Sequence, residues 1–360
     1  MLGHDASFGY IKAVELAASS SIIHKRTGYL LCSSCLSPDH EFRFMLVNQM
    51  QRDMSSSSIL EICSSLLAVT NLITVDMVPA MSTHVEKLLD HGSEIVRKKA
   101  IIAYHRLYQL CDSTISTDTL IEKLRKVLCD RDPSVMGSCL NVIESMSMVN
   151  PTPFKDLVSS LISILKQVIE HRLPSDFEYH RVPAPWIQMK IVRILSILGK
   201  NDAVSSNGMY EILGECMRKA DVGINAGYAV VYECVRTITS IYPNAMLLDA
   251  AADAIARFIT SPSQNLKYFG VTGLAAIVES HPEYATAHQM SVIECLEDRD
   301  ETLQRRTLDL LYKMTNPMNV QFITEKLLHF LKSTTDEFLK KDLTEKVCTL
   351  AERYAPNNLW

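Results

Sequence analysis

The fold is decided by the stretch His91-Gly92-Ser93-Glu94-Ile95-Val96-Arg97-Lys98-Lys99-Ala100. Gly and Ser favour a turn, and the apolar Val96 that follows them opens a helical pattern. Basic residues come next, and a small residue stands four positions after Val96. The stretch therefore predicts a turn followed by the first turn of a helix.

The same arrangement recurs along the chain. It starts at residues 23, 59, 96 and 135, and again at 266, 303 and 339, whereas it is hard to follow between 217 and 242. The starts are 36, 37 and 39 residues apart in the first group and 37 and 36 apart in the second. Two helices with their turns fill such a unit, which matches the roughly 40-residue period of HEAT and armadillo repeats. The sequence therefore predicts an all-α fold, a right-handed α-solenoid of HEAT/armadillo-like repeats, in a single domain over residues 1–360.

Local signals predict some helix starts and one interruption. Asp or Ser followed by Pro is typical of an N-cap and a first helical residue, and it occurs at Asp132-Pro133, Ser37-Pro38 and Ser261-Pro262. The segment 171–185 holds too much Pro for a helix and predicts an ordered loop between repeats. Long loops are often functional, and the alternative is a loop that only covers a groove. The aromatic residues that could anchor this loop are Phe177, Tyr179 and Trp186.

Composition and motifs argue against nucleic-acid binding and catalysis. The net charge is −5, whereas proteins that bind nucleic acid through their bulk surface carry an excess of Lys and Arg. Gly199-Lys200 lacks the Ser or Thr and the earlier Gly of a phosphate-binding loop. Cys32-Ser33-Ser34-Cys35 has no second pair of zinc ligands, and the acidic residues at 297–301 are typical of a solvated turn with local ion pairs. We therefore predict a protein that is not an enzyme and uses no metal or cofactor.

Membrane contact is expected to be peripheral, because no apolar run reaches the roughly 18 residues that span a bilayer. Two basic groups hold like positions in their repeats and would line one edge of a solenoid. Each basic residue near an anionic leaflet contributes about 1 kcal/mol. The predicted contact with an anionic membrane consists of Lys25, Arg26, Arg97, Lys98 and Lys99. The alternative is a solvated helix face with ion pairs inside the repeats.

Several stretches, in one order, resemble the trunk of the large adaptins. They are Gly3–Ile11, Lys25–Leu30, Val47-Asn48, Val96–Ala100, Val182–Gln188, Asn265–Tyr268, Ala287–Met290 and Ala351–Pro356. Asp5–Tyr10 and Pro183-Ala184-Pro185-Trp186 resemble the epsilon type more than the gamma or alpha types. The likeness spans essentially the whole chain.

The resemblance implies a scaffold in a vesicle coat. A large adaptin assembles with a beta, a mu and a sigma subunit on the cytosolic face of the trans-Golgi network. An ARF-family GTPase in its GTP form recruits such complexes, which select transmembrane cargo through short sorting signals. By the same resemblance, Ile11 and Val14, with Met45 on the next repeat, match positions that meet the GTPase switch surface. The alternative is that these three are ordinary core residues.

Other assignments stay open at this point. The chain could be another HEAT-repeat scaffold, such as a gamma-type adaptin, a transport receptor or a phosphatase scaffold. It could also be an enzyme without a familiar motif, or a truncated product that does not assemble. The resemblance implies that a complete large adaptin has further helices before this segment, and more trunk repeats, a hinge and an appendage after it.

Overall fold

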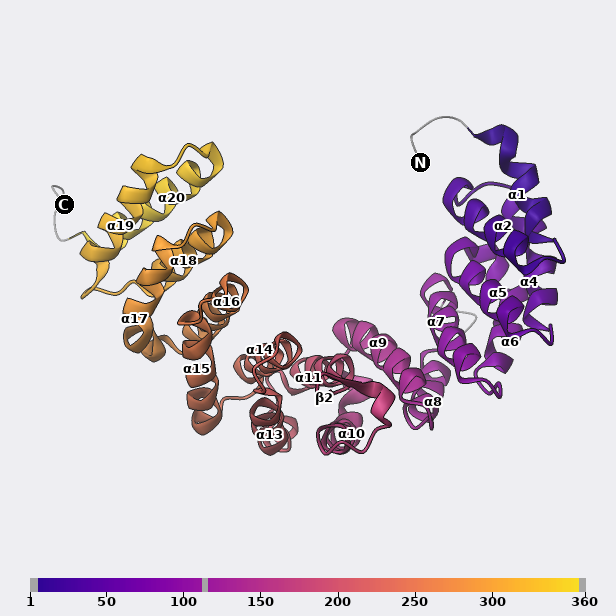
Figure 1. Cartoon of the computed structure of the whole chain (residues 1–360), viewed down its shortest axis with the longest axis horizontal. Helices are drawn as coiled ribbons and strands as arrows, with labels where there is room; N and C mark the ends of the chain where they lie inside the picture. The colour runs from indigo at the N-terminus through magenta and orange to yellow at the C-terminus, as the bar shows by residue number, and fades with distance from the viewer. Residues whose placement is uncertain (1–5, 112–115, 356–360) are drawn as a thin grey trace. The chain divides into compact units, whose positions relative to one another are not determined.

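The computed structural model describes residues 6–111 and 116–355, which are almost entirely helical (Figure 1). They form two compact units, 1–154 and 155–360. In each unit, successive helices alternate between two packed layers, so the predicted all-α repeat fold is confirmed. A single domain over 1–360 stays a prediction. Residues 3–5 and 356 of the adaptin-like stretches lie outside the described residues.

The first unit has a first layer of α2, α5, α7 and α9, which pack side by side in that order. The second-layer helices α1, α4, α6 and α8 each pack on the first-layer helix that follows them. The α-helices are α1 (Tyr10–Ala17), α2 (Ile22–Cys35), α3 (Phe42–Met45), α4 (Val47–Met54), α5 (Ile59–Leu72), α6 (Val78–Leu88), α7 (Glu94–Leu110), α8 (Thr117–Leu128) and α9 (Pro133–Val149). The 3-10 helices are η1 (Ser7–Gly9) and η2 (Val75–Met77), and η3 (Thr152–Leu157) follows α9.

The second unit repeats this plan, with α11, α14, α16, α18 and α20 in the first layer and α10, α13, α15, α17 and α19 in the second. Its α-helices are α10 (Val158–Ile169), α11 (Pro185–Gly199), α12 (Ala203–Asn207), α13 (Tyr210–Ala220), α14 (Asn225–Ser240), α15 (Ala245–Ile259), α16 (Gln264–Ser280), α17 (Ala285–Glu294), α18 (Glu301–Lys313), α19 (Val320–Ser333) and α20 (Glu337–Tyr354). Its other elements are η4 (Ser175–Phe177), β1 (Glu178–Tyr179), β2 (Val182–Pro183), η5 (Pro282–Tyr284) and η6 (Cys295–Glu297).

The predicted repeat starts coincide with the first layer. Residues 23, 59, 96, 135, 266, 303 and 339 all fall in the first turn of a first-layer helix. Between the two groups of predicted starts, the first-layer helices begin at Pro133, Pro185, Asn225 and Gln264, so the steps are 52, 40 and 39 residues. The long step contains the inserted loop, and the other two keep the repeat period.

Small residues mark places where the two layers approach closely. A Cβ atom on Gly28 of α2 would lie 2.2 Å from the backbone N of Ala17 in α1. A Cβ atom on Gly270 of α16 would lie 2.6 Å from the backbone N of Ile259 at the end of α15. Because glycine has no Cβ, the first-layer helix can touch the backbone of the second layer at these points.

One of the three predicted helix starts is confirmed. Asp132 caps α9 by accepting bonds from two backbone N–H groups of the first turn, and Pro133 is the first helical residue. The other two predictions are wrong. Pro38 lies in a turn before α3, and α16 begins at Gln264 with Ser263 as its N-cap residue. The hydroxyl of Ser261 instead accepts the Ser263 N–H and closes the turn before the helix.

The inserted loop is an ordered hairpin. Its antiparallel strands pair Glu178 with Pro183 and Tyr179 with Val182. Val182 and Pro183 are buried, and Nε2 of Gln188 donates to the carbonyl O of Pro183 at 2.6 Å. Tyr179 and Trp186 are about half exposed and do not anchor the loop as predicted, whereas Phe177 is half-buried and its carbonyl O accepts the Ala184 N–H at 2.7 Å. The aliphatic strand β2 and a buried amide hold it instead.

Candidate functional site on the exposed helix faces of the first unit

Lys25 lies in the core of the first unit rather than at its surface. Its side chain is 5% exposed, and its Nζ lies 2.5 Å from Oδ1 of Asp53 and 3.1 Å from Oε1 of Glu61. Asp53 also accepts bonds from the Tyr29 hydroxyl at 2.6 Å and from Nε2 of Gln49 at 2.8 Å. Burial alone would lower the pKa of Lys25, but the bonds to both carboxylates raise it above its ordinary value, so the ammonium stays charged. Because this charge is buried and neutralised inside the unit, Lys25 is not available for the predicted membrane contact.

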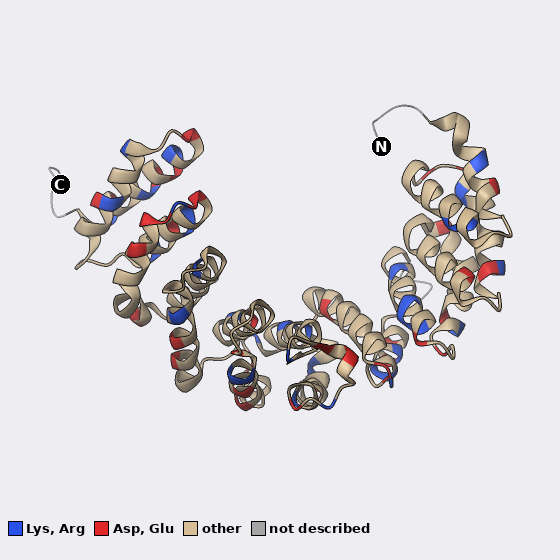
Figure 2. Cartoon of the chain, in the orientation of Figure 1, with Lys and Arg blue, Asp and Glu red and all other residues tan. Residues whose placement is uncertain are grey.

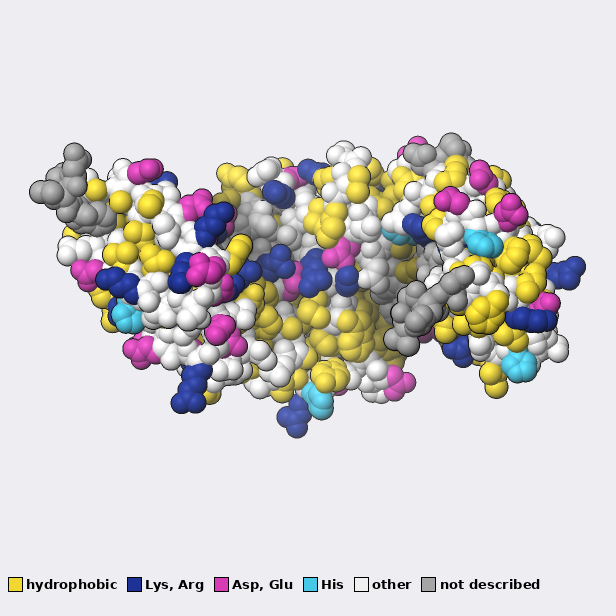
Figure 3. Space-filling model, turned by 90° about the horizontal axis from the view of Figure 1, so that it is seen from above, with side chains coloured by type: hydrophobic (Ala, Val, Ile, Leu, Met, Phe, Trp, Pro, Cys, Tyr) yellow, Lys and Arg dark blue, Asp and Glu magenta, His cyan; other side chains and the backbone are white. Residues whose placement is uncertain are grey.

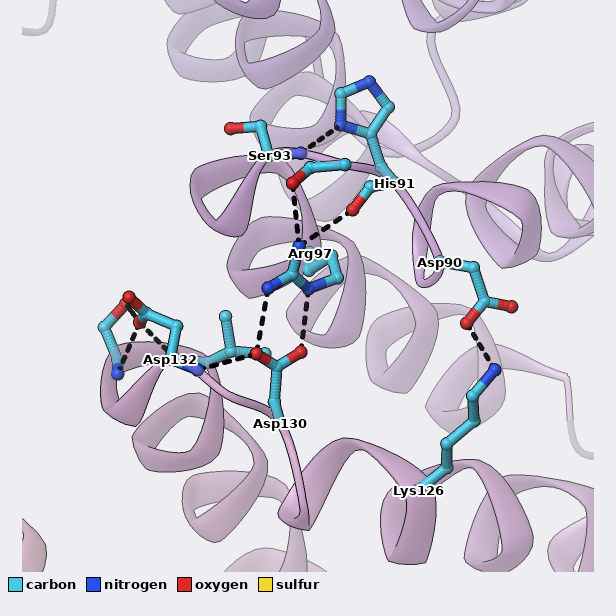
Figure 4. Close-up of polar contacts among 10 residues, drawn as sticks. Asp90, His91, Ser93, Arg97, Lys126, Asp130 and Asp132 are labelled. Carbon is cyan, nitrogen blue, oxygen red and sulfur yellow. Dashed lines mark hydrogen bonds and ion pairs between the residues drawn. The ribbon is translucent and has the colours of Figure 1, made fainter.

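Arg97 on α7 is also engaged within the unit (Figure 4). Its Nε and Nη2 lie 2.7 and 2.9 Å from the two carboxylate oxygens of Asp130, which stands between α8 and α9. Its Nη1 donates to the carbonyl O of His91 at 2.9 Å. The bond from Arg97 lowers the pKa of Asp130 below its ordinary value. Bidentate pairs are among the stronger polar contacts, and together with the bond from Nη1 this pair engages all three guanidinium nitrogens of Arg97. Arg97 is therefore not available for the predicted membrane contact either.

Ion pairs also join neighbouring repeats in the second unit. Nζ of Lys267 on α16 lies 2.8 Å from Oδ2 of Asp298, and Arg305 on α18 pairs with Asp336. The acidic turn at 297–301 carries an ion pair, but not a local one as predicted, because the partner of Asp298 belongs to the preceding first-layer helix. A basic residue near the start of one first-layer helix and an Asp just before the next form a recurring link along the stack.

Sequence reasoning missed the carboxylates that neutralise these cations. Asp130-Arg131-Asp132 and Asp298-Arg299-Asp300 share one spacing just before a first-layer helix. In both, the first Asp accepts the N–H of the second Asp, and the second Asp caps the helix. This Asp-x-Asp spacing is a signal that could have identified Arg97 as an inter-repeat partner. Asp53 carries no comparable signal.

The three remaining predicted cations form no ion pair with any residue that the structure describes. They are Arg26 on α2 and Lys98 and Lys99 on α7. Arg26 and Lys98 are exposed, and Lys99 is half-buried. These three stay available to a partner of opposite charge.

An apolar groove runs between α2 and α5. It has a volume of about 300 Å³, and its lining includes Ile23, Arg26 and Leu30 from α2 and Ser64 and Leu67 from α5. Ile23, Leu30 and Leu67 are 72%, 66% and 53% exposed. Figure 3 shows hydrophobic side chains lying among charged ones on the face in view. Exposed aliphatic side chains gathered at a groove are typical of a protein interaction site.

The residues predicted to contact a GTPase separate into one core residue and two exposed ones. Val14 on α1 is buried, which agrees with the alternative that it belongs to the core. Ile11 on α1 and Met45 on α3 are exposed, and these two helices pack together. Phe44, also on α3, and Phe8, in the 3-10 helix η1 just before α1, are exposed as well. We name Phe8, Ile11, Phe44 and Met45 the α1–α3 face.

Two buried thiols are suited to packing rather than to nucleophilic chemistry. Burial raises the pKa of the Cys139 thiol, and a hydrogen bond with Cys216 together with burial raises that of Cys234. Thiols with raised pKa values are poor nucleophiles. Within 6–111 and 116–355, no three His, Cys, Asp or Glu side chains gather as metal ligands would, and no helix is long and apolar enough to cross a bilayer. Figure 2 shows basic and acidic residues interspersed over the helices of both units.

Comparisons with known proteins place this architecture in a family. The family model described as the Adaptin N terminal region matches residues 1–360. The AP-4 complex subunit epsilon of Arabidopsis thaliana is 45% identical over the whole chain, and the AP-4 complex subunit epsilon-1 of Homo sapiens is 42% identical over the same span. The AP-1 complex subunit gamma of Dictyostelium discoideum is 30% identical over 363 residues. The chain spans 38%, 32% and 40% of the length of these relatives.

Solved structures agree on the fold. A homology model of the full-length AP-3 complex in an intermediate open conformation matches 94% of this chain and 57% of its own chain, with a TM-score of 0.60 and 17% identity. An engineered protein matches with a TM-score of 0.58 and 14% identity, over 96% of this chain and 89% of its own. At such identities the likeness concerns the fold alone. The family model, however, covers every residue, and the chain therefore belongs to the adaptin family, within its N-terminal region.

Proposed function

We propose that the chain is part of the large subunit of a heterotetrameric vesicle-coat adaptor complex of the AP-4 type, and that it acts as a non-enzymatic scaffold. The observation that carries this proposal is 45% identity, over all 360 residues, to a protein named as an epsilon subunit of that complex. Beta, mu and sigma subunits would complete the assembly. It would act peripherally on the cytosolic face of the trans-Golgi network and sort transmembrane cargo through short signals.

An ARF-family GTPase in its GTP form is proposed to bind the α1–α3 face. The four side chains of this face are 88%, 40%, 53% and 54% exposed, so each can bury further apolar area on association. Complete burial of such a side chain is worth about 1.5–3 kcal/mol. GTPase switch segments are ordered by contacts to the γ-phosphate and released on hydrolysis. Binding through these segments would therefore depend on the nucleotide.

The test is capture of the purified chain by an ARF GTPase locked in its GTP or GDP form. Capture is expected in the GTP form only, with a loss of at least about tenfold in Ile11→Glu and Met45→Glu, equivalent to about 1.4 kcal/mol. Met246→Glu, an exposed apolar position in the second unit, is the matched control and should leave capture unchanged. Capture that ignores the nucleotide, or that falls equally in all three variants, would refute the assignment of this face.

A further inference from the structure

The first unit carries a second apolar surface on its first layer. Large aliphatic side chains are exposed on three helices that pack side by side, α2, α5 and α7. They are Ile23 and Leu30 on α2, Leu60 and Leu67 on α5, and Ile95 on α7, with exposures of 72%, 66%, 60%, 53% and 49%. Ile23, Leu30 and Leu67 line one groove, and apolar side chains gathered in this way mark an interaction surface more often than scattered surface leucines do.

Helical spacing brings basic residues of α7 onto the same surface. Ile95, Lys98 and Lys99 stand at i, i+3 and i+4, so they share one side of α7. Burial raises the pKa of the Cys63 thiol on α5 and the nearby charge of Lys99 partly offsets this, so Lys99 lies beside α5. Lys98 is its sequence neighbour and is exposed. The cations of α7 therefore continue the line of the α2–α5 groove.

Basic residues outnumber acidic ones among the unpaired charges on this surface. Arg26 lines the groove, and Lys98 and Lys99 stand on α7, each without an ion pair to any residue in the described ranges. Two acidic residues occur on the three helices. Glu61 is bound to Lys25 inside the unit, whereas Glu94, the first residue of α7, is exposed one helical turn from Lys98. A complementary partner must carry carboxylates beside apolar side chains.

We infer that this α2–α5–α7 face, made of the five aliphatic residues above with Arg26, Lys98 and Lys99, binds an acidic amphipathic α-helix of a protein partner. Packed helices lie about 8–10 Å apart, and residues i and i+7 of an α-helix are about 10.5 Å apart. A helix laid across the three would thus place apolar anchors in successive grooves, with flanking carboxylates beside Arg26 and Lys98. An anionic bilayer would attract the cations but leave the recess between α2 and α5 unfilled. This site goes beyond the proposed function, because it is separate from the α1–α3 face and takes a different partner.

The inference is tested with a fluorescein-labelled peptide of about five helical turns, followed by fluorescence anisotropy. Leu stands at i, i+3 and i+7 on one side of the peptide, and Glu flanks this stripe. Leu67→Glu is expected to weaken binding at least about tenfold. Arg26→Glu should weaken it by an amount that shrinks as salt is raised, because salt screens exposed charges. Both residues are exposed, so the variants should keep the helical content and melting temperature of the parent chain.

Two controls make the outcome decisive. Met246 is 84% exposed and lies in the other unit, so the Met246→Glu variant should bind the peptide like the parent chain. A peptide of identical composition with Leu distributed around the helix should bind weakly. Equal binding of both peptides, or equal losses in Leu67→Glu and Met246→Glu, would overturn the inference. Phosphatidylserine-rich vesicles that capture the chain through Arg26, with no peptide binding, would also overturn it and make the face a membrane surface. GTPase capture is scored separately with Leu67→Glu, which leaves the α1–α3 face intact, so failure of one site is not mistaken for failure of the other.

Discussion

Replacement of Asp53 by Ala tests the buried network that joins α2, α4 and α5. The Asp53 side chain is 3% exposed, and its carboxylate accepts bonds from Lys25, Tyr29 and Gln49. The variant would leave the buried ammonium of Lys25 with Glu61 alone and would remove the partner of the Tyr29 hydroxyl. Removing one member of a buried ion pair costs about 3–5 kcal/mol. For a unit of this size about 3 °C of melting temperature is lost per kcal/mol, so a fall of about 10 °C is expected.

Native-state hydrogen exchange is the best assay, because repeat stacks can unfold in parts. Amides of α2, α4 and α5 should lose protection in Asp53→Ala, whereas those of the second unit should keep it. The double variant Lys25→Met with Asp53→Leu should recover most of the loss, because apolar side chains can replace a buried pair. A loss below about 1 kcal/mol, or equal losses in both units, would refute the view that this pair is structural.

Other positions give sharp expectations. Gly28→Ala should lower the melting temperature of the first unit, because its methyl group would lie 2.2 Å from the backbone N of Ala17; an unchanged melting curve would contradict the close packing of α1 on α2. Arg97→Lys should lose the bidentate pair with Asp130 and about 1–2 kcal/mol in urea unfolding, while Arg26→Lys should cost nothing measurable; equal effects would argue against the inter-repeat link. Since the bond from Arg97 lowers the folded-state pKa of Asp130, its stabilisation is complete above the ordinary carboxyl pKa of about 3.9 and is lost as the pH falls through the folded-state value. The parent chain should therefore lose more stability on acidification than Asp130→Asn does, and parallel curves of unfolding free energy against pH would contradict this.

The repeat could be predicted because it depends on residues close in sequence. Helix starts, helical periodicity and the small residue four positions on are all local, so even a divergent stack keeps a readable period. N-caps were predicted less well. Asp132 and Ser261 both precede a Pro, but a helix starts directly after Asp132 and not after Ser261. A hydroxyl that closes a turn and a carboxylate that caps a helix look alike in a sequence until the helix start is known.

The candidate site was harder to predict, because a cation's availability depends on carboxylates about 30 residues away. Lys25 and Arg26 are adjacent, yet one is buried and the other exposed. Lys25 shares the spacing of three and four with Gly28, Tyr29 and Cys32, the buried side of α2, so periodicity could have placed it inside. No local rule, however, identifies Asp53 as its partner.

The central claim is that the chain is a large-subunit scaffold that assembles with a small subunit and is recruited through its N-terminal repeats. The most direct test is co-expression with a sigma subunit of the AP-4 type, followed by affinity capture on an ARF GTPase in its GTP or GDP form. The account predicts that sigma co-purifies in equal amount and that the pair is held only by the GTP form, through Ile11 and Met45. A chain that is folded by circular dichroism but retains neither sigma nor the GTPase would contradict it.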